Sequence, residues 1–214
     1  MAMNIYRLLE YPWFYKLTVR IFSLGGRARK LNSFIDNLLS SECRGRVLEL
    51  GSGTCQFRPL FLKYVENYVA TDINLKYLKD SQQDEPSLNY VVSDASRLPF
   101  ALQRFDRIFA LYLYHHLSDQ QTLNSLEEMF RCLKPEGKII IVDNFLPEHR
   151  YDPVARAVAK LDRGQHIRRR QVMVDLVRKS ARAAHVEEHH SIPGSWPYVM
   201  SAYIVSLGPQ SQSR

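Results

Sequence analysis

The feature that most constrains this chain is the alternation of apolar, β-branched runs with segments of helical spacing. Six runs rich in Val, Ile, Tyr and Phe have the length and composition of strands, namely Arg46–Leu50, Tyr68–Thr71, Asn89–Val92, Phe105–Leu113, Lys138–Asp143 and Tyr198–Val205. Segments with helical spacing lie between them, at Phe57–Tyr64, Leu75–Ser81 and Gln120–Cys132. This alternation predicts an α/β fold with a doubly wound, mostly parallel sheet covered by helices on both faces.

The first of these runs leads directly into a glycine-rich turn, Gly51–Ser52–Gly53–Thr54, ahead of a helical segment. Glycine permits positive φ and lets the backbone approach a ligand without an intervening Cβ. The start of the following helix presents backbone N–H groups that lack helical partners. The turn therefore predicts a ligand site, and the plainer alternative is a tight connection that binds nothing.

Three carboxylates accompany the ends of the first three predicted strands. Glu49 lies in the first strand, Asp72 follows the second strand 19 residues after Gly53, and Asp94 follows the third. A doubly wound fold places an acid at the position of Asp72, where it accepts hydrogen bonds from ribose hydroxyls. Because the carboxyl ends of parallel strands meet at one edge, we expect all three acids along that edge.

Five segments, in order over residues 45–145, resemble the class I S-adenosylmethionine (SAM)-dependent methyltransferase family. They read VLELGSGT, ATDIN, VVSDASRLPF, FDRIFALYLYHHLSD and RCLKPEGKIIIVD. The resemblance implies a Rossmann-like, seven-stranded sheet that ends in an antiparallel β-hairpin, here expected from His185–Ile192 and Tyr198–Ser206. It also implies SAM as cofactor, S-adenosylhomocysteine as product and no metal.

The resemblance also assigns residues to the cofactor. They are Glu49, Gly51, Ser52, Gly53, Thr54, Asp72, Ile73, Asp94, Ala95, Ala110 and Leu111. The glycine turn would hold the methionine end, and Asp72 would pair with the ribose hydroxyls. Asp94 would meet the adenine amino group, with Ile73 packed on the ring. Ala110 and Leu111 would line the methionine chain.

Two positions near the turn separate this sequence from related patterns. The family's third small residue is Cys55 here, so we expect the helix to stand slightly further from the cofactor or the thiol to point away. A dinucleotide-binding G-x-G-x-x-G motif would need glycine at Gln56, which disfavours NAD.

We expect one domain over residues 1–207, since 214 residues with 45% hydrophobic content suit a single core. Residues 1–43 are predicted to form an N-terminal helical lid and 44–145 the cofactor-binding core. Residues 146–184 would supply a substrate-facing segment and a helix, and 185–207 the terminal β-hairpin. We expect 208–214 to be a disordered tail and the protein to be a monomer or weak homodimer.

The formal net charge of +7 is unevenly distributed. Residues 1–46 hold eight Lys and Arg against three Asp and Glu, and 150–182 hold ten against three, whereas 47–149 hold ten against fourteen. The flanks would therefore build any anion-attracting surface, although a solvated face is the plainer interpretation.

The apolar runs are too short to span a membrane, and the N-terminus lacks the order of a signal peptide, so we expect a cytoplasmic protein. The three cysteines, Cys43, Cys55 and Cys132, show neither CxxC nor zinc-site spacing. Buried reduced thiols are the expectation for all three.

Methyl transfer from a sulfonium is an in-line displacement, so the protein mainly positions a nucleophile and removes its proton. His115 and His116 follow the fourth strand and are candidate general bases, since imidazole titrates near neutral pH. A structural or cofactor-shaping role is at least as well supported, because the resembled family often carries His-His-Leu here in members with different substrates. Asn144, within Asp143–Asn144–Phe145 at the end of the fifth strand, should face the acceptor and orient it or cap the next turn.

Candidate acceptor-binding residues come from the two flanks. Tyr11 and Tyr15 belong to the aromatic lid, and Arg163 and His166 are predicted to face the site. Arg163, with Arg168, Arg169 and Arg170, could bind a carboxylate or phosphate in a forked fashion, or some of the four could simply be solvated.

Three acceptor classes are compatible with the sequence. A small, possibly anionic metabolite methylated on O or N is the expected acceptor, because it fits the compact size and the aromatic lid. A lipid or membrane-bound acceptor fits the basic, aromatic N-terminus, and RNA fits the basic flanks, although no Asn-Pro-Pro-Tyr-type motif follows the fourth strand. A domain that binds SAM as a partner protein without catalysis is a further alternative.

Overall fold

The structure is a computed structural model, which describes residues 27–146, 166–180, 184–189 and 199–207. The first part of the predicted lid, most of the predicted substrate-facing segment and the predicted tail lie outside the described residues.

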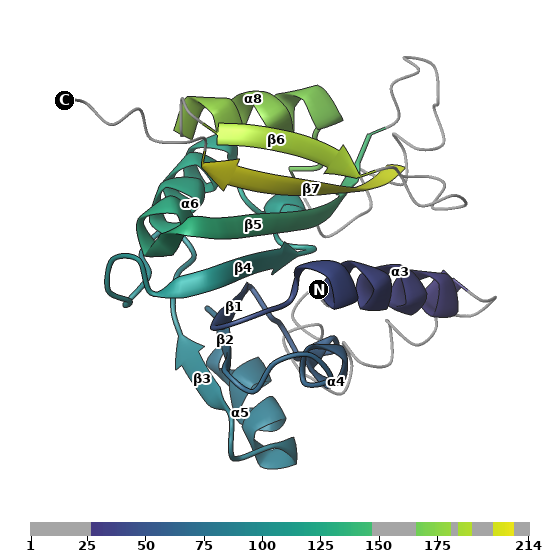
Figure 1. The fold of residues 1–214 in the computed structure, drawn as a ribbon, viewed down its shortest axis with the longest axis vertical. Helices are drawn as coiled ribbons and strands as arrows, with labels where there is room; N and C mark the ends of the chain where they lie inside the picture. Colours follow the sequence, from purple (N-terminus) through teal and green to yellow (C-terminus); the bar gives the residue numbers. More distant parts are fainter. Residues whose placement is uncertain (1–26, 147–165, 181–183, 190–198, 208–214) are drawn as a thin grey trace, which may run out of the picture.

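A single seven-stranded sheet runs through the molecule in the order β3-β2-β1-β4-β5-β7-β6 (Figure 1). The strands are β1 Val47–Leu50, β2 Tyr68–Asp72, β3 Asn89–Val92, β4 Phe105–Leu111, β5 Leu133–Phe145, β6 Ala184–His189 and β7 Val199–Leu207. Neighbours from β3 to β5 pair in parallel, and β7 pairs antiparallel with both β5 and β6. The predicted mostly parallel sheet with a C-terminal antiparallel hairpin is confirmed.

Helices cover both faces of this sheet. The described helices are α3 Arg27–Glu42, α4 Arg58–Phe61, α5 Leu75–Asp84, α6 Asp119–Cys132 and α8 Arg170–Ser180, together with the 3-10 turn η1 Tyr114–His116. One buried cluster packs the sheet against α6 and α8 through Leu126, Met129 and Met173. A second cluster packs the opposite face against α3, α4 and α5 through Leu39 and Phe61. Each such fully buried side chain contributes roughly 1.5–3 kcal/mol to folding.

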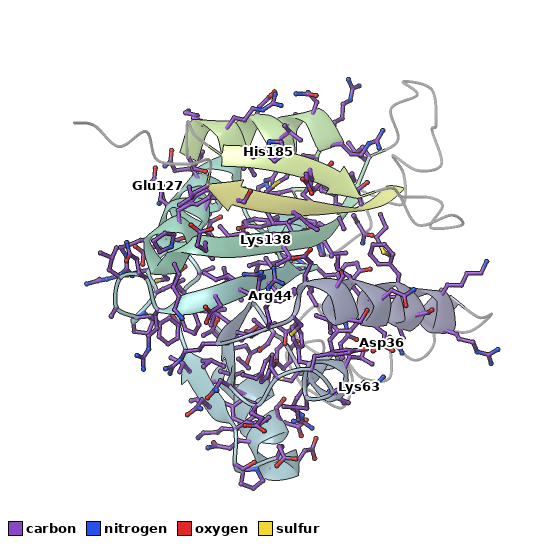
Figure 2. The ribbon with its side chains drawn as sticks, in the orientation of Figure 1. Asp36, Arg44, Lys63, Glu127, Lys138 and His185 are labelled. Atoms are coloured by element: carbon purple, nitrogen blue, oxygen red, sulfur yellow. The ribbon has the colours of Figure 1, made fainter. Side chains whose placement is uncertain are left out.

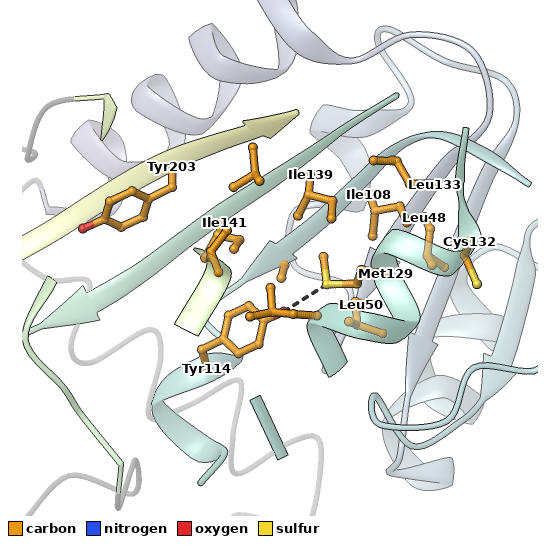
Figure 3. Packing of buried hydrophobic residues seen from close by; sticks show 14 of the residues in the cluster. Leu48, Leu50, Ile108, Tyr114, Met129, Cys132, Leu133, Ile139, Ile141 and Tyr203 are labelled. Atoms are coloured by element: carbon orange, nitrogen blue, oxygen red, sulfur yellow. Dashed lines mark hydrogen bonds between the residues drawn. The ribbon is translucent and has the colours of Figure 1, made fainter. Parts of the chain in front are cut away.

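The short η1 turn is tied into the first cluster. The hydroxyl of Tyr114, a fully buried residue, donates to Sδ of Met129 at 2.9 Å (Figure 3). The next helix, α6, begins with a capping box in which Ser118 and Gln121 satisfy each other's backbone N–H groups. Since η1 follows β4, these contacts fix the backbone just beyond the end of that strand.

Element boundaries differ from the sequence prediction at two places. The predicted helix Phe57–Tyr64 is reduced to the single turn α4, because Lys63 and Tyr64 donate their backbone N–H groups to residues three positions earlier. Both side chains then bind Asp36 of α3, and Figure 2 shows Lys63 beside that residue. In addition, β5 starts at Leu133, which pairs with Phe105, so the predicted stop signal 134–137 lies within the strand.

The three cysteines are free and buried, as predicted. Among the described residues, none of the helices combines the length and hydrophobicity that crossing a membrane requires.

Candidate functional site

The glycine-rich turn after β1 has the left-handed backbone that its sequence predicts. Gly51 has φ +68° and Gly53 has φ +55°, in the left-handed region that favours glycine. A Cβ at Gly51 would lie 2.6 Å from Cδ1 of Leu113, whereas a Cβ at Gly53 would have no heavy atom within 4 Å. Gly51 therefore packs against the protein, and Gly53 leaves open space beside the turn.

Asp72, at the end of β2, is bonded to this turn. Its Oδ2 accepts the backbone N–H of Gly53 at 2.8 Å, and its Oδ1 accepts that of Asn74 at 2.8 Å. Burial raises the pKa of Asp72 although these backbone bonds act in the opposite direction. Each carboxylate oxygen can accept more than one hydrogen bond, so Asp72 retains acceptor capacity for a ligand hydroxyl.

An exposed apolar strip lies next to Asp72. Ile73 is 70% exposed, and Leu75 and Val92 are each about half exposed. The register places Val92 opposite Asp72. Asp94 is exposed beyond β3, and its Oδ1 accepts the N–H of Ser96 at 2.7 Å. The contributions of Leu75 and Val92 were missed from the sequence, because an apolar residue in a predicted helix or strand is normally assigned to the core.

Other residues assigned to the cofactor point into the protein. Glu49 is buried and accepts a hydrogen bond from the hydroxyl of Tyr68. Burial raises the pKa of Glu49 to about 8. Ala110 and Leu111 are also buried, in the first and second clusters respectively, at the end of β4.

Cys55 occupies the position where a third small residue was expected. It has φ +52°, and its side chain is buried in the second cluster with Sγ 3.4 Å from Oγ of Ser52. Of the two expectations for this departure, the thiol pointing away from the open side of the turn is the one observed. A non-glycine residue with positive φ stores strain.

His115, in η1 after β4, meets Asp143, which lies near the end of β5. Nδ1 of His115 lies 2.6 Å from Oδ1 of Asp143, and the backbone N–H of His115 donates to Oδ2 at 3.1 Å. Both side chains are buried, whereas His116 is exposed and its ring centroid lies 3.9 Å from that of His115. Burial alone would raise the pKa of Asp143, but the charge and hydrogen bonds of His115 lower it.

Tyr112, between β4 and η1, packs against the second cluster close enough to Asp143 for that charge to act on its hydroxyl. It has φ +59°, stacks on Phe57 with ring centroids 6.2 Å apart, and donates its hydroxyl to Sδ of Met200 at 2.6 Å. Burial and the nearby charge of Asp143 raise the pKa of Tyr112 well above its ordinary range. The sequence did not indicate this residue, since positive φ at a tyrosine has no sequence signal.

The amino-acid sequence is similar to those of known proteins. A family profile described as a methyltransferase domain matches residues 48–141. The demethylmenaquinone methyltransferase of Streptomyces griseus is 27% identical over 129 residues, which cover 60% of this chain and 55% of that protein. The ubiquinone/menaquinone biosynthesis C-methyltransferase UbiE of Erwinia tasmaniensis is 30% identical over 121 residues, covering 52% and 47%. The chain thus spans about half the length of these curated relatives.

The fold is also similar to that of a solved structure. The SAM-dependent methyltransferase of Aquifex aeolicus superposes with a TM-score of 0.65 and 17% identity, over 89% of this chain and 97% of that one. Residues 48–141 match a methyltransferase domain, and the sheet has the fold of a SAM-dependent methyltransferase. The match and the fold support SAM as the cofactor.

The fold carries a site that fits SAM. The open side of Gly53 admits a ligand against the backbone, Asp72 offers carboxylate oxygens beside it, and Ile73 presents an apolar surface for a flat ring. Gly53 follows β1, and Asp72 and Ile73 stand at the end of β2, next to the point where the sheet reverses its strand order between β1 and β4.

The predicted acceptor residues are only partly described. Tyr11, Tyr15 and Arg163 lie outside the described residues. His166 is exposed, and its backbone N–H donates to the carbonyl of His115 at 3.0 Å, which places it beside that histidine. Asn144 is half-buried next to Asp143, and its N–H donates to Oδ1 of Asp143 at 2.7 Å.

The structure corrects the interpretation of Arg168. Its guanidinium, predicted either to bind an anionic ligand or to be solvated, is buried and donates to the backbone carbonyls of Tyr114 and Leu117. Helical spacing gave no hint of this, because the partners come from a segment about 50 residues earlier. Arg169, its exposed neighbour, stays compatible with the solvated alternative.

Proposed function

We propose that this protein transfers the methyl group of SAM to a small molecule bound beyond the carboxyl ends of β4 and β5, with His115 as the general base. The observation that carries the proposal is the buried contact of 2.6 Å between Nδ1 of His115 and Oδ1 of Asp143. The pair stands at the same edge of the sheet as the glycine turn and Asp72.

Asp143 supports proton transfer in two ways. Its pKa is lowered, so it is a carboxylate at neutral pH and can only accept hydrogen bonds. Nδ1 of His115 therefore carries a proton, which leaves Nε2 as the atom that accepts one. The buried negative charge then stabilises the imidazolium that forms.

SAM supplies a methyl group on a positively charged sulfur, which an attacking atom displaces in line. The chain's own residues position the acceptor and accept the proton that it loses. A general base of this kind contributes about 10²- to 10⁴-fold to the rate. A hydroxyl or amine that must lose a proton is the acceptor group that gains most from the His115–Asp143 pair.

Tyr112 favours an acceptor with an apolar, planar part. It is half-buried, lies close enough to Asp143 for that charge to raise its pKa, and stacks on the buried ring of Phe57. Arg168 is engaged by backbone carbonyls, so an anionic group on the acceptor would depend on Arg163 or the exposed Arg169. We therefore propose O- or N-methylation of a small, hydroxylated or amino-substituted ring compound.

A second candidate is methylation at carbon. Two relatives are named as demethylmenaquinone and as ubiquinone/menaquinone C-methyltransferases. Removing a proton from a ring hydroxyl makes the neighbouring ring carbon nucleophilic, so the same base would serve this reaction. The two candidates differ only in the atom that receives the methyl group.

Product analysis tests the proposal. The protein is incubated with SAM and a panel of phenols, hydroquinones and aromatic amines, and the methylated atom is identified by NMR. Methylation at O or N supports the first candidate, and methylation at ring carbon supports the second. Turnover that persists in a His115→Asn variant would contradict the assignment of the base in both.

A further inference from the structure

Two segments that are far apart in sequence meet around His115. One is η1 with the start of α6, and the other is residues 166–169, which lead into α8. The backbone N–H of His166 donates to the carbonyl of His115 at 3.0 Å, and that of Leu146 donates to the carbonyl of Arg168 at 2.9 Å. The end of β5, the turn with His115 and the start of α8 are thereby joined.

Arg168 makes the side-chain contacts of this junction. Its Nη1 donates to the carbonyl of Tyr114 at 3.1 Å and to Oγ1 of Thr122 at 3.2 Å, and its Nη2 donates to the carbonyl of Leu117 at 2.6 Å. Nη2 also lies 3.0 Å from Oδ1 of Asp119, which is largely exposed. The arginine side chain is 8% exposed, so these contacts form with little competition from water.

The two backbone carbonyls that Arg168 binds lie on either side of His115 in the sequence. Tyr114 is the residue before His115, and Leu117 is two residues after it. With His166 on the carbonyl of His115 itself, three of the four carbonyls from 114 to 117 are held from the α8 side. The Tyr114 carbonyl also accepts the backbone N–H of Leu117 at 3.2 Å, so loss of the guanidinium would remove one of its two donors together with the Nη2 donor of the Leu117 carbonyl. Weakening both contacts would favour a different backbone path for η1.

We propose that Arg168 is a positioning residue that holds η1 so that Nδ1 of His115 stays in line with Asp143. This inference rests on the proposed function of His115, but it makes a structural claim that is measurable without an acceptor. Arginine suits the role because its planar fork reaches two carbonyls and a hydroxyl at once, whereas the single ammonium of lysine does not.

The charges near His115 determine which variant is informative. Asp143 faces it from β5, His116 lies beside it on η1, and Arg168 approaches from the α8 side together with its partner Asp119. Replacing Arg168 by a neutral residue would change the local charge and the geometry together. Arg168→Lys keeps the positive charge and removes the fork.

The test is proton NMR of the SAM-bound protein, which detects the hydrogen-bonded Nδ1 proton of His115 as a downfield resonance. His115→Asn and Asp143→Asn assign the resonance by abolishing it. We expect Arg168→Lys to remove or strongly broaden the signal while SAM affinity stays within about twofold, because Arg168 makes no contact with Gly53 or Asp72. Arg169→Lys, an exposed neighbour, should leave the signal unchanged.

A wild-type signal in a folded Arg168→Lys variant would overturn the positioning role. If that variant does not fold, Thr122→Val decides, since it removes one acceptor of Arg168 from a fully buried site without changing charge. It should weaken or shift the resonance, and an unaltered resonance would refute the proposal.

Activity separates this inference from the proposed function. A signal that depends on Arg168, combined with methyl transfer that is unaffected in His115→Asn, would retain the positioning and refute His115 as base. Loss of turnover in His115→Asn, combined with an unchanged signal in Arg168→Lys, would retain His115 as the base and refute the positioning role of Arg168.

Discussion

Nδ1 of His115 lies 2.6 Å from Oδ1 of Asp143, although 28 residues separate the two in the sequence. They meet because β4 and β5 are parallel neighbours with Leu111 opposite Val142, so Asp143 is the next residue of β5 at the edge where β4 ends and leads into η1. The carboxylate also accepts the backbone N–H of His115 at 3.1 Å, which fixes the ring and its backbone together. The pair is thus assembled by the fold before any acceptor binds.

Asp143→Asn should reduce turnover by about 10²- to 10³-fold, because the amide no longer stabilises a protonated imidazole. The affinity for SAM should stay within about twofold, since Asp143 is not part of the glycine turn. Steady-state kinetics and calorimetric titration with SAM measure the two quantities separately.

His116→Asn is the matched control for that variant, because its ring is exposed and adjacent. It should lower turnover far less than Asp143→Asn does. Equal losses of turnover and of SAM affinity in Asp143→Asn would instead assign the His115–Asp143 pair to shaping the cofactor site.

Two glycine variants should separate stability from binding. Gly53→Ala places a methyl group in open space, so it should weaken SAM binding by tenfold or more while lowering the free energy of unfolding by only about 1 kcal/mol for positive φ. In Gly51→Ala the added Cβ would lie 2.6 Å from Cδ1 of Leu113, so this variant should lower the free energy of unfolding by roughly 2 kcal/mol or more. Calorimetry and urea denaturation measure both effects, and the reverse ranking would refute the placement of the cofactor beside Gly53.

Asp72→Ala should weaken SAM binding by roughly 10- to 100-fold, because it removes a charged hydrogen-bond acceptor beside the turn. The variant should keep a cooperative unfolding transition. Asp84→Asn, on the exposed last turn of α5, is the control and should bind SAM as the wild type does. Calorimetry that finds unchanged affinity in Asp72→Ala would contradict its role at the cofactor.

Glu49 should make stability depend on pH. Burial raises its pKa in the folded protein to about 8, so between its ordinary value and pH 8 the folded protein retains a proton that the unfolded chain has lost. Glu49 therefore makes its full contribution to the free energy of unfolding at low pH. As pH rises toward 8 this contribution falls, by an amount on the order of 4 kcal/mol.

Glu49→Gln removes this titration while its amide oxygen can still accept from Tyr68. Urea denaturation at pH 5.5 and pH 8.5 should show a smaller decline in the variant than in the wild type. An identical decline in both proteins would exclude Glu49 as the group responsible.

The cofactor half of the site was largely predictable from the sequence, because it depends on local signals at strand ends. The glycine pattern predicted the positive φ at Gly51 and Gly53, and the alternation of strands and helices predicted that Asp72 would lie beside them. Positions that alternate or repeat along the chain carry this information directly.

The acceptor half was less predictable, because it depends on contacts between distant segments. The burial of Arg168 follows from backbone carbonyls of η1, and no pattern around residue 168 indicates them. Likewise, the left-handed backbone at Tyr112 and Cys55 is imposed by tertiary packing, against the usual preference of these residue types.

Transfer of labelled methyl from SAM tests the central claim most directly. The wild type and Asp143→Asn are incubated with labelled SAM and a cell extract that has been separated into small polar and aromatic molecules, lipids and RNA. The account predicts label in the small-molecule fraction with the wild type, and at least about 100-fold less with the variant. Label confined to lipid or RNA, or equal labelling by both proteins, would contradict it.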